Sequence, residues 1–313
     1  MLDDAFRKCI QAGLEADGST DPSAHSTPGR LGEAIEMAGF LDLLVAPQDG
    51  GAGLDLSALY GIARICGELL VPLPVAETIL ARGWASANGF GSLDGAWIAF
   101  GGETHAVPHA AYSTHILDAE CGELRLRRIL DPGTDRWRTG SGTRLRLDDP
   151  QPIGPTGGLP IETAGAGLCA AWIAGGLHAI ASMSLAHATG RVQFGRPLSR
   201  FQAVQQMMAQ LIEEVAAAEA ASRQLFRGSR FEARLVAIAK VRTGEAAELV
   251  SAHAHQVHGA LGMTEDYPLS RVTRHIAAWR QAWGGEGYWS RQLGVWLAGL
   301  TEGTIATRLI DNC

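Results

Sequence analysis

Three histidines in the C-terminal half are the first residues whose types could do chemistry. His253, His255 and His258 could ligate a transition metal, because an imidazole nitrogen is a common metal donor. On a helix, however, only His255 and His258 are spaced to lie near one another, and no carboxylate stands at ligand spacing from them. The pattern therefore predicts no metal site.

Two acidic pairs and one glycine-rich loop fit other kinds of site. Glu213–Glu214 and Glu265–Asp266 could serve acid–base chemistry, but adjacent residues on a helix do not share a face, and most such pairs are solvated. The loop DGGAG at residues 49–53 lacks the G-x-G-x-x-G spacing and the βαβ context of a dinucleotide fingerprint. None of these patterns carries a function by itself.

The composition of the chain excludes several classes of function. Its 313 residues are 46% hydrophobic and 19% charged, a balance that predicts a folded protein with internal domains. The net charge of −7, without a local basic patch, gives no general attraction to nucleic-acid phosphates or anionic lipids. We therefore expect neither a nucleic-acid partner nor a membrane partner.

The cysteines and the first residues predict a reducing compartment. The five cysteines are scattered, odd in number and without a C-x-x-C pair, which predicts reduced thiols. The chain opens with MLDD, which is acidic where a signal peptide would be basic. The expected location is the cytoplasm.

Apolar spacing divides the chain into three zones. Helical spacing extends to about residue 88, and it resumes after a Gly/Pro-rich connector at residues 152–160. Between them, apolar runs at 96–100, 115–117, 123–126 and 143–147 predict strands. We expect a mainly α fold with a small central β domain: an N-terminal helical domain at 1–90, a reduced β domain at 91–160 and a C-terminal four-helix bundle at 161–313.

Two long helices of this bundle can be bounded from the sequence. Apolar residues from Phe201 to Leu225 recur at alternating spacings of three and four, which is the seam of a packed helix. Ser199 with Gln202 offers a capping box at its start, and Gly228 offers a stop. A second helix is expected from about residue 232 to 258.

A nearly uncharged segment at residues 165–188 is about long enough to cross a bilayer. It contains His178 and His187, and it is rich in Gly and Ala with few large aliphatic residues. A helix that is apolar all round is also what the centre of a bundle requires. We expect a buried bundle helix rather than a membrane span.

Four tryptophans gather near the C-terminus of a chain with few aromatic residues: Trp279, Trp283, Trp289 and Trp296. Packing at a subunit interface or around a bulky ligand would each explain them. We favour the interface, where tryptophan is enriched.

Two motifs on the bundle helices resemble the C-terminal domain of the acyl-CoA dehydrogenase flavoprotein family. They are RVQFGRPLSRFQ at residues 191–202 and QVHGALGMTEDYP at residues 256–268, and residues 39–53 are similar to that family's early helix and glycine loop. The resemblance implies an N-terminal helical domain, a central β domain and a four-helix bundle. It also implies α,β-dehydrogenation of an acyl-CoA thioester, in which a carboxylate removes the α proton and FAD takes a hydride.

The first motif supplies three cofactor residues by resemblance. Arg191 matches the arginine that approaches the FAD pyrophosphate of a neighbouring subunit, and Phe194 matches the aromatic residue beside that arginine. Gln202 matches the glutamine near the adenine end of the FAD. A guanidinium fork suits two phosphates. Alternatively, Arg191 is a charge that complements a helix dipole, and Gln202 is a capping-box partner.

The second motif supplies three further positions. Gln256, Gly259 and Gly262 match the segment of the family in which glycines let the backbone approach the dinucleotide. Gly259 could also be an ordinary helix C-cap.

The catalytic base of the family is the main departure. Its usual position falls on Trp283, followed by Gly284, and the position used by a minority of the family falls on Gly165, followed by Ala166. Neither position holds a carboxylate. Glu286 stands three residues after Trp283 and could serve as base only if the backbone were displaced by about one helical turn.

The short β zone is a second departure, because it lacks the Thr-Glu-Pro and Gly-Ser-Asp segments that line the flavin and thioester in the family.

The chain resembles the reduced subunit of bacterial heteromeric acyl-CoA dehydrogenases, notably those that act on steroid-derived CoA esters. The resemblance implies a full-length partner subunit, in a heterodimer or heterotetramer, that supplies the glutamate. Arg191 and the segment at Gln256 would complete the partner's FAD site, the substrate would be an acyl-CoA, and electron-transfer flavoprotein or a similar acceptor would reoxidise the flavin.

Three alternatives stay open at this point. The chain could be a self-sufficient dehydrogenase that uses Glu286 as base. It could be a flavin-free interaction protein that has kept only the bundle. It could also retain the fold for flavin monooxygenation, which needs no base for an α proton.

Overall fold

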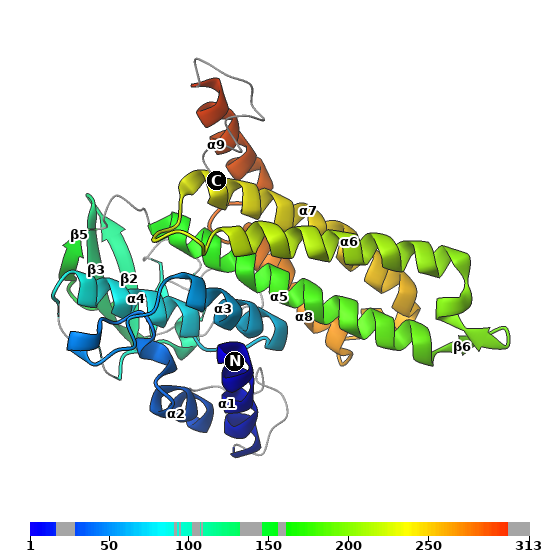
Figure 1. Ribbon diagram of the computed structural model, residues 1–313, viewed down its shortest axis with the longest axis horizontal. Coiled ribbons are helices and arrows are strands. Elements are labelled where there is room, and N and C mark those ends of the chain that lie inside the picture. Colours follow the sequence, from blue (N-terminus) through cyan, green and yellow to red (C-terminus); the bar gives the residue numbers. More distant parts are fainter. Residues whose placement is uncertain are drawn as a thin grey trace.

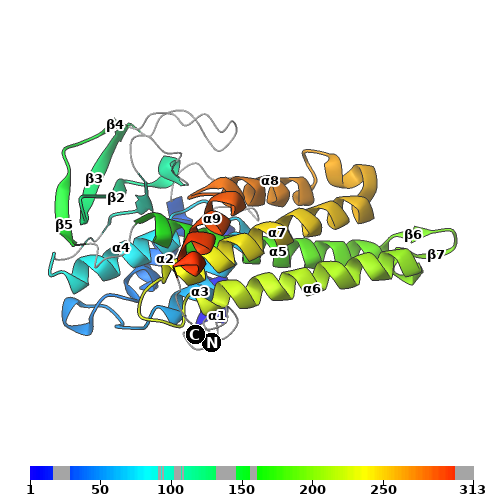
Figure 2. The same ribbon diagram turned by 90° about the horizontal axis from the view of Figure 1, so that it is seen from above.

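The computed structural model describes residues 1–16, 29–90, 93, 95–101, 107, 109–131, 146–155 and 161–299. Four short helices and a small sheet lie at one end of a long helical bundle (Figures 1 and 2). The expected fold class, mainly α with a small central β part, is confirmed. One hydrophobic core joins residues from all three zones, so the divisions at residues 90 and 160 stay predictions.

The N-terminal helices are α1 (Leu2–Ala16), α2 (Gly29–Met37), α3 (Ser57–Leu69) and α4 (Val75–Ala87). Helix α3 packs along α5 (Ile161–Gly190) with the two backbones almost in contact. A Cβ on Gly67 would overlap the carbonyl oxygen of Trp172, and a Cβ on Gly175 would overlap that of Arg64. This pair of glycines therefore joins the N-terminal helices to the centre of the bundle.

The described sheet consists of β1 (Ile98–Phe100), β2 (His115–Glu120), β3 (Glu123–Asp131), β4 (Arg146–Leu147) and β5 (Gln151–Pro155). Its order is β1-β2-β3-β4 with β5 also paired to β3, and only the β1–β2 pair is parallel. Cys121 and Gly122 both have positive φ, as a two-residue hairpin turn requires. The strands expected within 96–100, 115–117 and 123–126 are confirmed. Of the run at 143–147, residues 143–145 lie outside the described residues, and the rest is β4.

Helices α5, α6 (Gln202–Gln224), α7 (Ala233–His258) and α8 (Pro268–Gln281) form the bundle. Helix α9 (Glu286–Ala298) packs on α7 and projects away from the bundle (Figure 1). Among the described helices, α5 alone is long and apolar enough to cross a membrane, and 67% of its most apolar stretch is buried inside the protein. The expected buried bundle helix is therefore confirmed.

The apolar seam of α6 is confirmed, since Met208, Leu211, Val215 and Ala218 are buried. Both of its expected ends are wrong. Helix α6 begins at Gln202 with Phe201 as N-cap, and Ser199 lies in a separate short 3-10 helix. The C-terminal end comes at Gln224, before Gly228, because the following Leu225 and Phe226 turn into the core, where Phe226 packs edge-on against Phe231.

Candidate functional site

The residues singled out by the sequence lie at two opposite ends of the bundle (Figure 2). The distal end carries the hairpin of β6 (Val192–Gln193) and β7 (Arg196–Pro197) and the short helix η6 (Gly259–Met263). The inner end lies next to the sheet, and it carries Gly165 near the start of α5 and Trp283 just after α8.

Arg191 and Phe194 present their side chains to solvent at the distal end. Arg191 directly follows α5, and its carbonyl accepts a hydrogen bond from the N–H of Leu198 at 2.9 Å, which closes the base of the hairpin. At the hairpin tip, Phe194 and Gly195 have φ values of 51° and 78°. Such backbone is costly for phenylalanine, yet the Phe194 side chain is 92% exposed. The hairpin therefore holds an aromatic ring outward at an energetic cost, as binding surfaces often do.

The remaining cofactor candidates also lie at the distal end. Gln202 and Gln256 are exposed, in the first turn of α6 and the last turn of α7. Gly259 ends α7 with φ 61° and ψ −145°, a conformation close to one that only glycine adopts, and a Cβ added there would point into open space. Gly262 is buried, and a Cβ there would lie 2.9 Å from the Cβ of His258. Gly259 is therefore free to face a ligand, whereas Gly262 has a packing role.

Two stacked histidines join the two distal segments. The rings of His187 on α5 and His258 on α7 lie 4.4 Å apart at an interplanar angle of 29°. Burial lowers the pKa of both imidazoles, and the neighbouring His258 and Arg191 add to this for His187. A lowered pKa favours the neutral form of both rings, which suits the close stack. This contact places residue 191 and residue 259 at the same end of the bundle.

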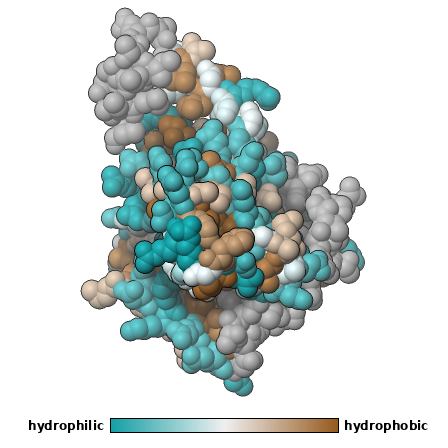
Figure 3. Space-filling view, turned by 90° about the vertical axis from the view of Figure 1, so that its right-hand side faces the viewer, coloured by the Kyte–Doolittle hydropathy of each residue, from teal (hydrophilic) through white to brown (hydrophobic). Residues whose placement is uncertain are grey.

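The surface of the distal end mixes apolar and basic side chains. Val192, Phe194, Leu261 and Met263 are exposed to between 48% and 92%. Figure 3 views this end of the molecule and shows brown apolar patches among teal polar side chains. The segment at residues 191–202 contains three arginines and no acidic residue, in a chain of net charge −7. The segment at residues 191–202 therefore offers an aromatic ring and positive charge, whereas the exposed Glu265 and Asp266 follow η6 at the same end.

The three histidines considered for metal binding have other partners. His253 pairs with Gln210 at 2.9 Å, His255 with Thr273 at 3.3 Å, and Nδ1 of His258 donates to a backbone carbonyl. Within the residues that the structure describes, no group of three histidine, cysteine or acidic side chains is arranged to hold a metal ion.

At the inner end, Trp283 lies directly on Gly165. A Cβ on Gly165 would overlap the indole of Trp283, so the indole can occupy this place only while residue 165 is a glycine. Trp283 has a φ of 58°, in the left-handed region, and is half-buried. The two positions that the resemblance assigns to a catalytic base are thus in contact with each other.

Glu286 lies on a different helix from Gly165. It is the first residue of α9, its carboxylate accepts a hydrogen bond from Nε of Arg280, and a Cβ on Gly244 of α7 would overlap it. Arg280 also binds Glu248 at 2.8 Å. Trp283, not Glu286, is therefore the residue in contact with Gly165, and the role of Glu286 as base stays a prediction.

Lys240 holds the segment that carries Trp283. Its ammonium is buried and donates to the backbone carbonyls of Trp279, Arg280 and Ala282 at 2.9–3.1 Å. Burial lowers the pKa of Lys240, and burial also raises the pKa of the nearby Cys169 thiol to about 12. Sequence reasoning missed Lys240, although its rarity was a signal, because the chain contains only one other lysine.

Further buried aromatic residues pack next to the segment that Lys240 holds. Trp172 on α5 lies 5.9 Å from Trp279 on α8 and 5.1 Å from the His109 ring, and His109 pairs with Glu77 at 2.9 Å. Nothing in the sequence pattern indicated the Glu77–His109 pair. The favoured interface role is wrong for Trp279 and Trp289, which are 2% and 4% exposed because both pack inside this chain.

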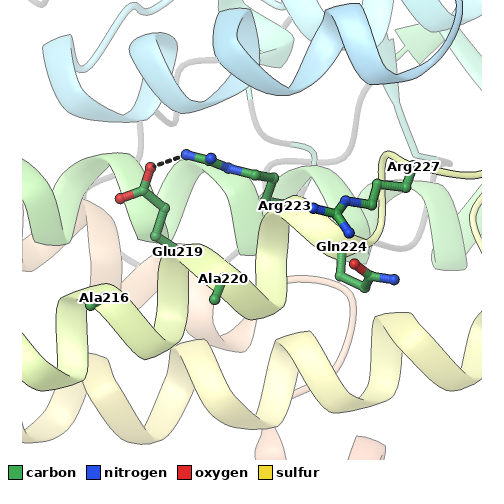
Figure 4. A pocket seen from close by; sticks show the side chains of 6 residues that line it. All are labelled: Ala216, Glu219, Ala220, Arg223, Gln224 and Arg227. Atoms are coloured by element: carbon green, nitrogen blue, oxygen red, sulfur yellow. Dashed lines mark hydrogen bonds and ion pairs between the residues drawn. The ribbon is translucent and has the colours of Figure 1, made fainter. Parts of the chain in front are cut away.

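A surface pocket on α6 contains none of the predicted site residues. Ala216, Glu219, Ala220, Arg223, Gln224 and Arg227 line it (Figure 4). Arg223 donates to Glu219 at 2.7 Å and lies over the ring of Tyr60 on α3, so its charge is already paired. This arrangement is typical of a surface that supports helix packing.

Comparisons with known proteins agree with the motifs. Residues 163–296 match the model of the acyl-CoA dehydrogenase C-terminal domain. A relative described as acyl-CoA dehydrogenase IpdE2, from Mycobacterium tuberculosis, is 27% identical over 75% of this chain and 76% of its own length.

Solved structures share the whole fold. The Tcur3481–Tcur3483 steroid ACAD, solved as a variant, has a TM-score of 0.75 at 22% identity, over 95% of this chain and 96% of that one. The ChsE4–ChsE5 complex from Mycobacterium tuberculosis has a TM-score of 0.71 at 22% identity, over 96% and 97% of the two chains. Residues 163–296 are therefore an acyl-CoA dehydrogenase C-terminal domain, within a chain that has the acyl-CoA dehydrogenase fold.

Proposed function

We propose that this chain is the reduced subunit of a heteromeric, FAD-dependent acyl-CoA dehydrogenase, and that its distal end completes the FAD site of a full-length partner subunit. One observation carries the proposal. The distal end holds Arg191 and Phe194 outward, whereas at the inner end a tryptophan lies on a glycine where the family would place a carboxylate.

The distal residues fit part of an FAD molecule held by another chain. The Arg191 guanidinium would pair with the pyrophosphate, which carries two negative charges. The exposed ring of Phe194 would lie beside it, and the open backbone at Gly259 would allow close approach of the dinucleotide. The amide of Gln202 would bind toward the adenine end, and Gln256 would lie on the segment that approaches the dinucleotide. When bound, FAD accepts the hydride in the family's reaction.

The comparisons support a partner and a substrate class. One solved neighbour is described as a ChsE4–ChsE5 complex, and another as a steroid ACAD with two chain names. By analogy, the partner is a full-length acyl-CoA dehydrogenase subunit, and the substrate is a bulky, steroid-derived CoA thioester. The partner would supply the carboxylate for the α proton. Reoxidation by electron-transfer flavoprotein or a similar acceptor, and a cytoplasmic location, complete the proposal.

The content of bound FAD tests this proposal. The chain is purified alone and after co-expression with the full-length acyl-CoA dehydrogenase whose gene lies nearest, and FAD per chain is measured by absorbance after denaturation. We expect little FAD on the lone chain and about one FAD per pair of unlike chains. A full complement on the lone chain would contradict the proposal and favour a self-sufficient enzyme. A complex whose FAD content is independent of Arg191 would favour a flavin-free interaction subunit.

A further inference from the structure

The contact between Trp283 and Gly165 has a functional meaning that rests on the proposed function. If two alternative positions can each carry the base for the same proton, side chains at both must reach the same point in space. In this chain the two positions touch, and the indole of Trp283 occupies the place where a side chain at Gly165 would begin. The point that a base would occupy is therefore taken up by an aromatic ring.

The backbone on both sides of Trp283 is held in place. The carbonyl before it, that of Ala282, accepts a hydrogen bond from buried Lys240 at 2.9 Å. Its own carbonyl accepts one from the indole N–H of Trp289 at 2.9 Å. These two bonds fix the left-handed backbone at φ 58°, and the indole is consequently aimed at α5.

The space deeper along α5 is also filled. Trp172 follows Gly165 by seven residues and therefore lies two turns along the same face of the helix. It packs on Trp279 and on the edge of His109, and all three side chains are buried. A ligand that entered at Gly165 would meet packed side chains instead of an acyl pocket.

We propose that Trp283, seated on Gly165, closes the acyl site of this chain, so that the chain contributes to a cofactor site but holds no acyl group of its own. In a complex with a full-length partner, the acyl group would then be held by the partner alone.

The first experiment measures the coupling between the two residues in the lone chain. Gly165→Ala should lower the midpoint of thermal unfolding by about 3–10 °C, because its Cβ would overlap the indole. Trp283→Gly removes the ring at a backbone position that suits glycine, so this variant should fold. In the Trp283→Gly background, Gly165→Ala should have little effect, and free indole should raise the midpoint of Trp283→Gly but not that of the natural chain.

Gly167→Ala is the matched control on the same helix. A Cβ there would lie 3.1 Å from the ring of Phe231, and its effect should be the same with or without Trp283. If Gly165→Ala lowered the unfolding midpoint equally in the natural chain and in Trp283→Gly, the contact of Trp283 with Gly165 would be refuted.

The second experiment counts acyl sites by calorimetric titration with octanoyl-CoA. The lone chain should bind none, and the complex should bind no more than one molecule per pair of unlike chains. One molecule per lone chain, or two per pair, would overturn the closure. The two proposals can fail separately: a complex without FAD refutes the proposed function but leaves the coupling of Trp283 with Gly165 intact, whereas loss of that coupling leaves one FAD per pair intact.

Discussion

The two ends of the bundle each hold an aromatic residue in left-handed backbone, and they use it in opposite ways. Phe194 at the distal end has φ 51° and a side chain that is 92% exposed. Trp283 at the inner end has φ 58° and lies on Gly165. Both conformations cost energy, so the surroundings must hold them. The ring at the distal end is thus open to solvent, whereas the ring at the inner end is packed against another helix of the same chain.

Removal of Lys240 should have the largest effect, because it frees the segment that carries Trp283. Lys240→Met leaves three backbone carbonyls without their shared donor, and we expect the free energy of unfolding to fall by about 3–5 kcal/mol. Urea denaturation measures this. The exposed Lys8→Met is the control, and a similar loss for both variants would contradict the role of Lys240.

At the distal end, Arg191→Ala should weaken binding of FAD to the complex by about 10–100-fold, since a charge-assisted pair with a phosphate contributes about 1.5–3 kcal/mol. Fluorescence titration of the apo complex with FAD gives the affinity. Arg227→Ala, which changes an exposed arginine just after α6, is the control and should leave the affinity unchanged. Unchanged affinity for Arg191→Ala would remove the main support for the shared cofactor site.

Acid should destabilise the stacked histidines of the distal end. Burial lowers the pKa of His187 and His258, so the unfolded chain binds more protons than the folded chain below the ordinary histidine pKa of about 6.5. Stability should therefore be constant above about pH 7.5 and should fall as the pH drops through 6.5. His187→Gln should reduce this slope, which thermal unfolding between pH 5 and 8 measures, and His178→Gln on the same helix is the control.

Glu286→Gln tests the remaining candidate base. Its ion pair with Arg280 is partly buried, so the substitution should cost about 0.5–1.5 kcal/mol of stability. Turnover by the complex should stay within about twofold of the natural value, because another chain would supply the base. Loss of turnover without loss of stability would instead assign the base to Glu286.

The smallest effect is expected for Phe194→Gly, which distinguishes the two aromatic residues. Phe194 packs little within the chain, so relief of its backbone strain should leave stability unchanged or raise it by about 1 kcal/mol. The affinity of the complex for FAD should fall. Measured destabilisation by more than about 1 kcal/mol would mean that the ring has a structural role that its exposure conceals.

The sequence predicted what depends on local pattern. The seam of α6 and the burial of α5 follow from periodicity and composition, and each is where it was expected, whereas the distal motifs were assigned by resemblance to a family. The inner end could not be predicted in this way, because Gly165 and Trp283 meet through tertiary packing. The capping box at Ser199 failed for a related reason: a separate turn and Phe201 intervene, so the side chain of Ser199 does not reach the helix start.

The glycine contact between α3 and α5 sets the order in which the chain can fold as it is made. Gly67 has no partner until Trp172 has been synthesised, because it packs against the backbone of that residue. At ordinary rates of translation, roughly 5–20 s separate the two residues. During that interval the apolar face of α3 stays uncovered in the nascent chain. A chaperone that binds short apolar helices should therefore crosslink to nascent chains that end before residue 175, and it should release them once α5 has emerged.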